Sequence, residues 1–366
     1  INASDPAQPA EIGFYKPPGW AFGVAASGSF AYVADAFKGL RVLDVSDPGH
    51  PREVGNYEIE RGEAGEVIIV GNAAYMTDHN WGLLAFNISD PARPICTCLY
   101  GYPAHADAVT VSGDYAYVAA GYSGLRIINI SDPADPKEVG VYDTKVTYAT
   151  AVAVSQNLAY VLTIWGRQGA PIGLHIVDIS IPALPKWIGF YPGTSENGTF
   201  HDVAVDGKIV YLAGENQFCV LDVTNPANPI LRGFVQLANL WGAMMPGMAI
   251  SGNRAYVAMG GLKIIDVSNP FTPTLIGAYT PSYQASSVAI SDNKAYLAAG
   301  EAGLRIINVS DASHPIDLGF CATPGWATEV RVSGAMAYVS DGRSGLQVVD
   351  VSNPVNPIRA GSFDTR

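Results

Sequence analysis

The chain has little charge and no apolar run long enough to cross a membrane as a helix. Only 15% of its 366 residues are Asp, Glu, Lys or Arg, and no stretch reaches the roughly 18 apolar residues of a membrane-spanning helix. Acidic residues outnumber basic ones by 33 to 21, for a formal net charge of −12. The Lys and Arg residues form no cluster, so a nucleic-acid partner is not expected, because its phosphates would be repelled.

Helical periodicity and the familiar catalytic motifs are absent as well. No segment repeats its apolar residues at the 3.6-residue spacing of an amphipathic helix. The sequence contains no HExxH, paired CxxC, EF-hand loop, GxSxG, P-loop, or GxGxxG within a βαβ unit. Zinc-protease, nucleotide-binding and dinucleotide-binding functions therefore have no motif to support them.

Cysteines are few, and their spacing indicates no metal site. Cys96, Cys98, Cys219 and Cys321 show none of the paired spacings of zinc ligands. Cys96 and Cys98 lie two residues apart in an expected strand, so they would share a face and not readily bridge each other. We expect buried free thiols, with a disulfide or a metal site as the alternative.

Glycine and proline are plentiful, with 39 Gly and 25 Pro, a composition that predicts many short strands joined by tight turns. The main feature of the sequence is an internal repeat of about 42 residues. Its clearest segment reads GLRVLDVSDPGHPREVG, GLRIINISDPADPKEVG or GLKIIDVSNPFTPTLIG. Eight copies of this segment start at Gly39, Gly82, Gly124, Gly173, Gln217, Gly261, Gly303 and Gly345.

Each repeat contains four strand-like runs. They have the form V-x-V-S-G, AYVA, LRIIDVS and a short run such as EVGNY, and Ser-Gly or S-D/N-P turns separate them. Asp or Asn closes such a turn through its side chain, while Pro prevents the strand from continuing. Four antiparallel strands at this period are typical of a propeller blade. The predicted fold class is all-β, an eight-bladed β-propeller of four-stranded antiparallel blades.

We predict a single propeller domain over residues 1–366. Its blades are expected to begin near residues 22, 65, 107, 149, 200, 246, 286 and 328. Residues 1–16 resemble an extra outer strand that could clasp the last blade. The C-terminal segment PIRAGSFD offers the same strand, so either end of the chain could complete that blade.

The third run, seen as RVLDV, HIVDI, KIIDV and QVVDV, resembles the signature of the LVIVD-repeat family. The resemblance covers essentially the whole chain, because the run recurs in every repeat. It implies a β-propeller and a location outside the cytoplasm, secreted or on the cell surface, in a bacterial or archaeal protein. It implies no catalytic residues.

One repeat differs from the others. The Ser-Gly turn returns at regular spacing except between Gln156 and Gly207, where the fourth repeat carries the insertions IWGRQGAPIG and YPGTSENGTFH. In an up-and-down blade, the loop between the second and third strands and the connection to the next blade emerge on one rim. Both insertions should therefore rise on the same face, where the innermost strands begin.

Aromatic residues are predicted to gather on that rim as a ligand-binding surface, since large rings offer contact area at a small entropic cost. The alternative is that they plug the channel or cover blade edges. The predicted ligand-binding residues are Trp20, Trp81, Tyr148, Trp165, Trp241 and Trp326.

Acidic and histidine side chains should converge at the mouth of the central channel. Imidazole and carboxylate groups serve as proton carriers and as metal ligands. The candidate catalytic residues are His105, His201, Asp202, Glu66 and Glu329. Asp107, His201 and Asp202 are the candidate metal ligands, and Ca²⁺ would be the ion, since oxygen ligands predominate. A chain without any cofactor is the simpler expectation.

Three functions remain open. The leading prediction is a recognition or scaffold propeller that binds a glycan, peptide or protein through its loop-rich face. The second is a hydrolase or lyase that acts on an extracellular polymer at the channel mouth. The third is a structural subunit of a surface assembly.

Overall fold

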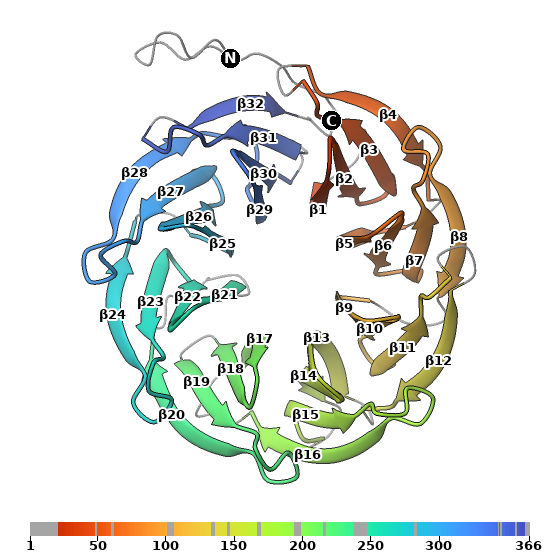
Figure 1. Ribbon diagram of the computed structural model, residues 1–366, viewed down its shortest axis with the longest axis vertical. Coiled ribbons are helices and arrows are strands. Elements are labelled where there is room, and N and C mark those ends of the chain that lie inside the picture. The colour runs from red at the N-terminus through yellow and green to blue at the C-terminus, as the bar shows by residue number, and fades with distance from the viewer. Residues whose placement is uncertain are drawn as a thin grey trace.

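The structure is a computed structural model that describes residues 21–47, 50–59, 62–100, 106–132, 136–144, 147–166, 170–193, 199–214, 217–237, 247–281, 284–342, 344, 346–355 and 357–362. Eight four-stranded antiparallel sheets stand around a common axis (Figure 1). The predicted eight-bladed β-propeller is confirmed. No helix formed by these residues is long and apolar enough to span a membrane.

The first half of the ring contains blades one to four, each numbered from its innermost strand outward. Their strands are β1 (Ala21–Ser27), β2 (Phe30–Asp35), β3 (Leu40–Asp44) and β4 (Arg52–Tyr57); β5 (Ala64–Val70), β6 (Ala73–Asp78), β7 (Gly82–Asn87) and β8 (Ile95–Tyr100); β9 (Ala108–Ser112), β10 (Tyr115–Ala119), β11 (Leu125–Asn129) and β12 (Lys137–Tyr142); β13 (Thr147–Ser155), β14 (Leu158–Gly166), β15 (Gly173–Asp178) and β16 (Lys186–Pro192).

The second half contains blades five to eight in the same arrangement. Their strands are β17 (Phe200–Asp206), β18 (Ile209–Gly214), β19 (Gln217–Asp222) and β20 (Ile230–Gln236); β21 (Gly247–Ser251), β22 (Arg254–Ala258), β23 (Leu262–Asp266) and β24 (Thr274–Tyr279); β25 (Ser287–Ser291), β26 (Lys294–Ala298), β27 (Leu304–Asn308) and β28 (Ile316–Cys321); β29 (Glu329–Ser333), β30 (Met336–Ser340), β31 (Leu346–Asp350) and β32 (Ile358–Ser362).

A tight turn sets the register of the first hairpin in each blade. In the first blade Ser27 pairs with Phe30, and Gly28 between them has a φ of +59°. Gln156 and Asp292 adopt the same left-handed conformation in blades four and seven, at 55° and 52°. A side chain is therefore tolerated here, although glycine adopts this conformation at lower cost.

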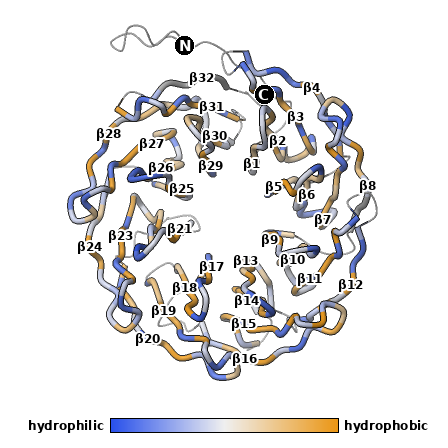
Figure 2. Tube along the Cα trace, in the orientation of Figure 1, coloured by the Kyte–Doolittle hydropathy of each residue, from blue (hydrophilic) through white to orange (hydrophobic). Residues whose placement is uncertain are grey.

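The hydrophobic core lies between neighbouring blades. Tyr32 and Val42 of the first blade pack against Met76, Leu84 and Phe86 of the second, and comparable clusters fill the other junctions. Hydrophobic positions recur in the blades all around the ring (Figure 2). Each sheet thus buries both of its faces, which explains the long apolar runs of the middle strands.

The ring closes between the first and eighth blades. Strand β32 is hydrogen-bonded to β31, so the C-terminal segment forms the outer strand of the eighth blade. The backbone N–H of Ala21 donates to the oxygen of Gly342 at 3.2 Å, and Val24 and Val33 pack with Val348 across the junction. The predicted clasp, residues 1–16, lies outside the described residues.

A glycine in the outer strand of a blade lets the next blade approach closely. Gly277 lies at a β-bulge in β24, opposite Ile264. A Cβ atom added to Gly277 would overlap the carbonyl oxygen of Ala312, in the outer turn of the following blade. Gly140 and Gly189 are placed in the same way against Pro182 and Pro226. These close contacts hold adjacent blades together at the outer edge of the ring.

Three cysteines are described as free thiols. Cys219 and Cys321 are buried, and Cys96 is partly buried. The side chain of Cys98 lies outside the described part of the chain. Burial raises the pKa of the Cys219 thiol to about 12, so this group packs as a small apolar side chain rather than reacting.

Candidate functional site

A cavity of about 620 Å³ opens where the innermost strands begin, on the axis of the propeller. Residues at or just before the start of β5, β9, β17, β21, β25 and β29 line it, together with Phe22 of β1 and His79 in the loop after β6. We call this cavity the channel mouth. Its titratable lining residues are Glu63, Glu66, His79, Asp107, His201, Asp202, Glu329 and Arg331.

The period-two alternation of the innermost strands places three carboxylates in the channel mouth. Val67, Val203 and Val330 are buried between blades, so the residue before each of them faces the cavity. These preceding residues are Glu66, Asp202 and Glu329. At the same repeat position the other blades carry Gly23, Ala108, Ala151, Gly247 and Ser287.

The carboxylates are held by the backbone of the next blade. The Oε2 atom of Glu66 accepts a hydrogen bond from the N–H of Val109 at 3.2 Å. Asp202 accepts from Met248 at 2.8 Å through Oδ2, and Glu329 accepts from the N–H of Val24. Each acid thus satisfies an N–H group at a blade junction, and its position in the cavity is fixed.

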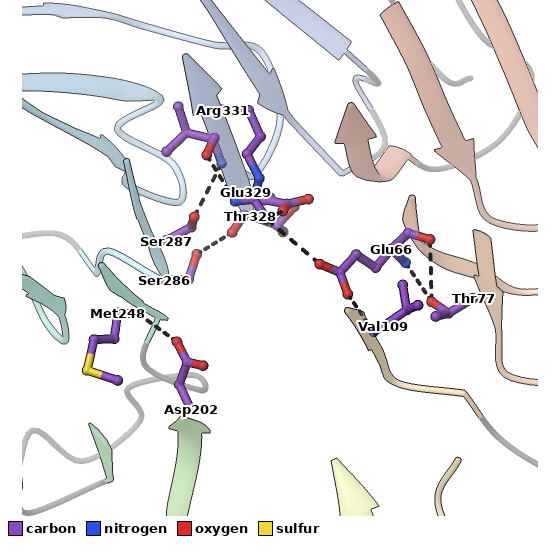
Figure 3. A network of polar contacts seen from close by, with 11 residues as sticks. Glu66, Thr77, Val109, Asp202, Met248, Ser286, Ser287, Thr328, Glu329 and Arg331 are labelled. Atoms are coloured by element: carbon purple, nitrogen blue, oxygen red, sulfur yellow. Dashed lines mark hydrogen bonds and ion pairs between the residues drawn. The ribbon is translucent and has the colours of Figure 1, made fainter. Parts of the chain in front are cut away.

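Arg331 is the one guanidinium among the described residues that line the channel mouth, and the sequence interpretation missed it. Its Nη2 atom lies 2.6 Å from Oε1 of Glu329 and 3.8 Å from Oε1 of Glu66. Figure 3 shows Glu66 reaching toward Arg331 and Glu329, with Asp202 on another strand beside Met248. The equivalent residues of the other blades are Ala25, Ile68, Thr110, Ala153, Ala204, Ala249 and Ala289.

Burial and mutual repulsion raise the pKa values of these acids. The pKa of Glu66 rises to about 7, mainly through burial and then through the charge of Glu329, with Arg331 opposing both. Burial raises the pKa of Asp202 to about 6, although the N–H groups of Met248 and Val203 oppose it. The side chain of Glu66 retains 27% exposure and that of Glu329 retains 17%. The channel mouth is therefore a place where negative charge is costly.

These raised pKa values predict that the free energy of unfolding increases as the pH is lowered from 8 to 5. A carboxyl whose pKa is higher in the folded than in the unfolded state binds more protons when folded, so stability falls as pH rises through that interval. Replacing Glu66 by Gln should raise the free energy of unfolding at pH 8 by about 1–2 kcal/mol and change it little at pH 5. Urea denaturation at both pH values measures this.

The matched control is Glu301→Gln, at an exposed acid on a loop of the seventh blade. That surface change should alter the free energy of unfolding by less than about 0.5 kcal/mol at pH 8. An unchanged pH dependence in Glu66→Gln would show that Glu66 is not destabilised by its surroundings.

A second charged pair lies at the edge of the cavity. His79, in the loop after β6, places Nε2 3.3 Å from Oδ1 of Asp107, and its backbone N–H donates to the backbone carbonyl oxygen of Glu63 at 3.0 Å. The hydrogen bond to Asp107 raises the pKa of His79, against the effect of burial. Burial and then the charge of Asp107 raise the pKa of Tyr148. An imidazole oriented by a carboxylate can accept or donate a proton.

The repeat pattern decides the family. The LVIVD repeat matches eight consecutive segments: residues 18–59, 61–100, 103–144, 147–192, 197–236, 245–281, 284–323 and 324–365. The chain belongs to the LVIVD repeat family. A search of curated proteins found no match.

Solved structures share the fold of this LVIVD-repeat propeller at very low sequence identity. The computationally designed protein Ika8 has a TM-score of 0.75 at 10% identity, over 93% of this chain and 99% of its own. Sqt1 of Saccharomyces cerevisiae has a TM-score of 0.70 at 8% identity, over 90% of this chain and 95% of its own. BamB of Moraxella catarrhalis has a TM-score of 0.62 at 14% identity, over 91% of this chain and 94% of its own. These similarities concern the architecture alone.

The predicted ligand-binding aromatic residues of this LVIVD-repeat propeller do not line the cavity, as far as they belong to the described part of the chain. Trp81 is partly buried and packs against the core between the first two blades. Trp326 is 39% exposed, and its ring lies over Gly300. Tyr148 packs edge-on against Tyr122, with ring centroids 4.9 Å apart. The side chain of Trp165 and the whole of Trp20, Trp241 and His105 lie outside the described residues.

The metal candidates are not gathered into one site. Asp107 faces His79, whereas His201 and Asp202 are neighbours on β17. Within the described ranges, no group of three or more His, Cys, Asp or Glu side chains could hold a metal ion. The described lining of the channel mouth therefore provides no ligand set for Ca²⁺, which requires six to eight oxygen ligands.

Proposed function

We propose that this LVIVD-repeat propeller is a recognition protein that binds a polypeptide partner at the channel mouth and takes up a Lys or Arg side chain of that partner. One observation carries the proposal: among the described residues, five carboxylates and one guanidinium line the cavity. The carboxylates belong to Glu63, Glu66, Asp107, Asp202 and Glu329. Such a lining favours a ligand that brings positive charge.

The pKa shifts support the same ligand class. The ionised forms of Glu66 and Asp202 are destabilised by burial, and a cation beside them would lower both pKa values. Because backbone N–H groups already fix these two side chains, little ordering entropy would be lost on binding. The volume of about 620 Å³ lies in the range of organic ligand sites and is far larger than a metal ion needs.

A glycan is the other ligand considered for this face, because sugar hydroxyls also donate to carboxylates. Protein sites for sugar rings present aromatic faces for stacking, whereas Phe22 is the one aromatic residue among the described lining residues and the described tryptophans do not line the cavity. A glycan therefore suits the channel mouth less well than a peptide with a cationic side chain. A secreted or cell-surface location belongs to the same proposal, and fractionation of the native cells would test it.

Calorimetric titration tests the proposal with three matched pentapeptides, capped at both ends, that carry Lys, Arg or Gln between alanines. The Lys and Arg peptides should bind at least tenfold more tightly than the Gln peptide, and 0.5 M salt should weaken them. A neutral oligosaccharide such as maltohexaose should not bind. Equal affinity for all three peptides, or binding of the oligosaccharide alone, would refute the assignment.

An enzyme is the second candidate, and the His79–Asp107 pair favours it. The 3.3 Å separation of Nε2 and Oδ1 in a concave site would suit a general base of a hydrolase or lyase. The sequence had suggested His105 and His201 for this role instead. Turnover of an extracellular polymer that disappears in His79→Ala would favour the enzyme. The recognition proposal predicts no turnover in either protein.

A further inference from the structure

Arg331 already places a cationic group inside the channel mouth. Its Nη2 atom lies 2.6 Å from Oε1 of Glu329, and its Nη1 atom donates to the backbone carbonyl oxygen of Val330 at 3.3 Å. All three residues belong to β29, so the guanidinium is held against its own strand. The side chain of Arg331 is 49% exposed and has room to turn away from this position.

The same guanidinium faces a carboxylate of another blade. Nη2 of Arg331 is 3.8 Å from Oε1 of Glu66, which is longer than a hydrogen bond. Glu66 belongs to the second blade and Arg331 to the eighth, and the first blade between them carries Gly23 in place of an acid. No side chain from that position separates the two, and Glu66 reaches toward Arg331 and Glu329 (Figure 3). Arg331 therefore stands between carboxylates of two blades.

Arg331 acts on the carboxylates that a bound cation would use. Burial raises the pKa values of Glu66 and Asp202, and the positive charge of Arg331 opposes the rise at both. A Lys or Arg side chain of a partner would stabilise the same ionised groups. Two cations in one cavity repel each other, so each weakens the binding of the other.

The blades do not need a cation at this position in order to fold. The equivalent residue is alanine in five of the other seven repeats, at Ala25, Ala153, Ala204, Ala249 and Ala289, and Ile68 and Thr110 occupy the remaining two. The charge of Arg331 is therefore a feature of this cavity and not of the repeat.

We propose that Arg331 is an internal competitor that sets the specificity of the channel mouth for cationic ligands. It occupies Glu329 and holds positive charge beside Glu66, so an incoming cation must displace it. A Lys or Arg held by the further contacts of its polypeptide can do so, whereas a free amine or guanidine is excluded. This inference rests on the proposed function, because it concerns the same cavity and the same class of ligand.

Calorimetric titration of the capped Lys pentapeptide into variants of Arg331 tests the proposal on the full chain. Arg331→Gln keeps an amide donor for Glu329 but no charge, and Arg331→Ala installs the residue of most other repeats. Both should bind the peptide about tenfold more tightly than the unaltered protein. Arg331→Lys keeps a cation beside Glu329, so its affinity should stay within about threefold of the unaltered protein.

Arg126→Ala controls for the change in net charge. Arg126 lies on β11, where its Nη1 atom is 3.2 Å from Oε1 of Glu138, and it does not line the cavity. Its replacement removes the same charge and should change the affinity less than about threefold, because salt screens distant charges.

A free guanidine gives a second measurement of the competition. Ethylguanidinium chloride at 20 mM, compared with sodium chloride at the same concentration, should weaken binding of the Lys peptide by Arg331→Ala and leave binding by the unaltered protein unchanged. An effect of the same size on both proteins would contradict the exclusion of free cations by Arg331.

The possible failures point to different claims. Absence of a gain in Arg331→Gln and Arg331→Ala, or an equal gain in Arg126→Ala, would overturn the internal competitor while leaving the cationic ligand in place. A gain of the same size in Arg331→Lys would also overturn it, since the charge would then not be what competes. Absence of Lys-peptide binding in all of these proteins would refute the proposed function, and the competitor with it.

Discussion

Gly277→Ala is expected to lower the free energy of unfolding by about 3 kcal/mol. The added Cβ would overlap the carbonyl oxygen of Ala312 and lie 2.9 Å from its carbonyl carbon. Both atoms belong to the backbone of the next blade and cannot move aside as a flexible side chain could. Either the β-bulge in β24 or the contact between blades six and seven must give way.

Urea denaturation of Gly277→Ala and of Gly71→Ala measures this effect against a matched control. Gly71 has a φ of +57°, and nothing lies within 4 Å of an added Cβ. That change should cost only about 1 kcal/mol, for the left-handed backbone. If Gly277→Ala cost no more than Gly71→Ala, the outer glycines would not control the packing of the blades.

The double variant Glu66→Gln, Asp202→Asn is expected to weaken binding of the Lys peptide about 100-fold. A hydrogen bond to a charged group contributes about 1.5–3 kcal/mol, and two such losses exceed the roughly 2.7 kcal/mol of a hundredfold change. Gln and Asn keep an oxygen that can accept from the N–H groups of Val109 and Met248, so the blade junctions should remain closed. Calorimetric titration gives the affinity, and circular dichroism reports on the fold.

Glu301→Gln provides the control for this loss. Glu301 is an exposed acid of the seventh blade and does not line the cavity, so its replacement should change the affinity less than threefold. Affinity of the double variant within threefold of the unaltered protein would contradict the assignment of Glu66 and Asp202. An equal loss in Glu301→Gln would indicate that net charge, and not the channel mouth, attracts the peptide.

The repeat allowed the architecture to be predicted from the sequence because every strand is delimited by its own turn chemistry. Ser-Gly turns and S-D/N-P turns mark the same positions in each unit, and one alignment therefore gives the strands, the blade number and the face on which innermost strands begin. That face in turn places Glu66, Asp202 and Glu329 at the cavity, where the structure has them.

Arg331 and His79 were missed for different reasons. Arg331 occupies a position where most other units carry alanine, so a comparison of the eight units residue by residue would have found it. His79 depends on the fold of a loop that has no insertion and no distinctive motif. Trp81 was predicted to bind a ligand, and the structure places it against the core between the first two blades. The contribution of a loop residue to the core depends on neighbours that the sequence does not reveal.

Proton release during titration of the Lys peptide tests the central claim most directly. The pKa values of Glu66 and Asp202 are about 7 and about 6, so at pH 6.5 part of each carboxyl is protonated, and a bound cation would expel those protons. Calorimetry at pH 6.5 in two buffers of different ionisation enthalpy should show release of up to about one proton per peptide. The Glu66→Gln, Asp202→Asn variant should show none. Binding with no proton release, or with proton uptake, would contradict a cationic ligand at the channel mouth.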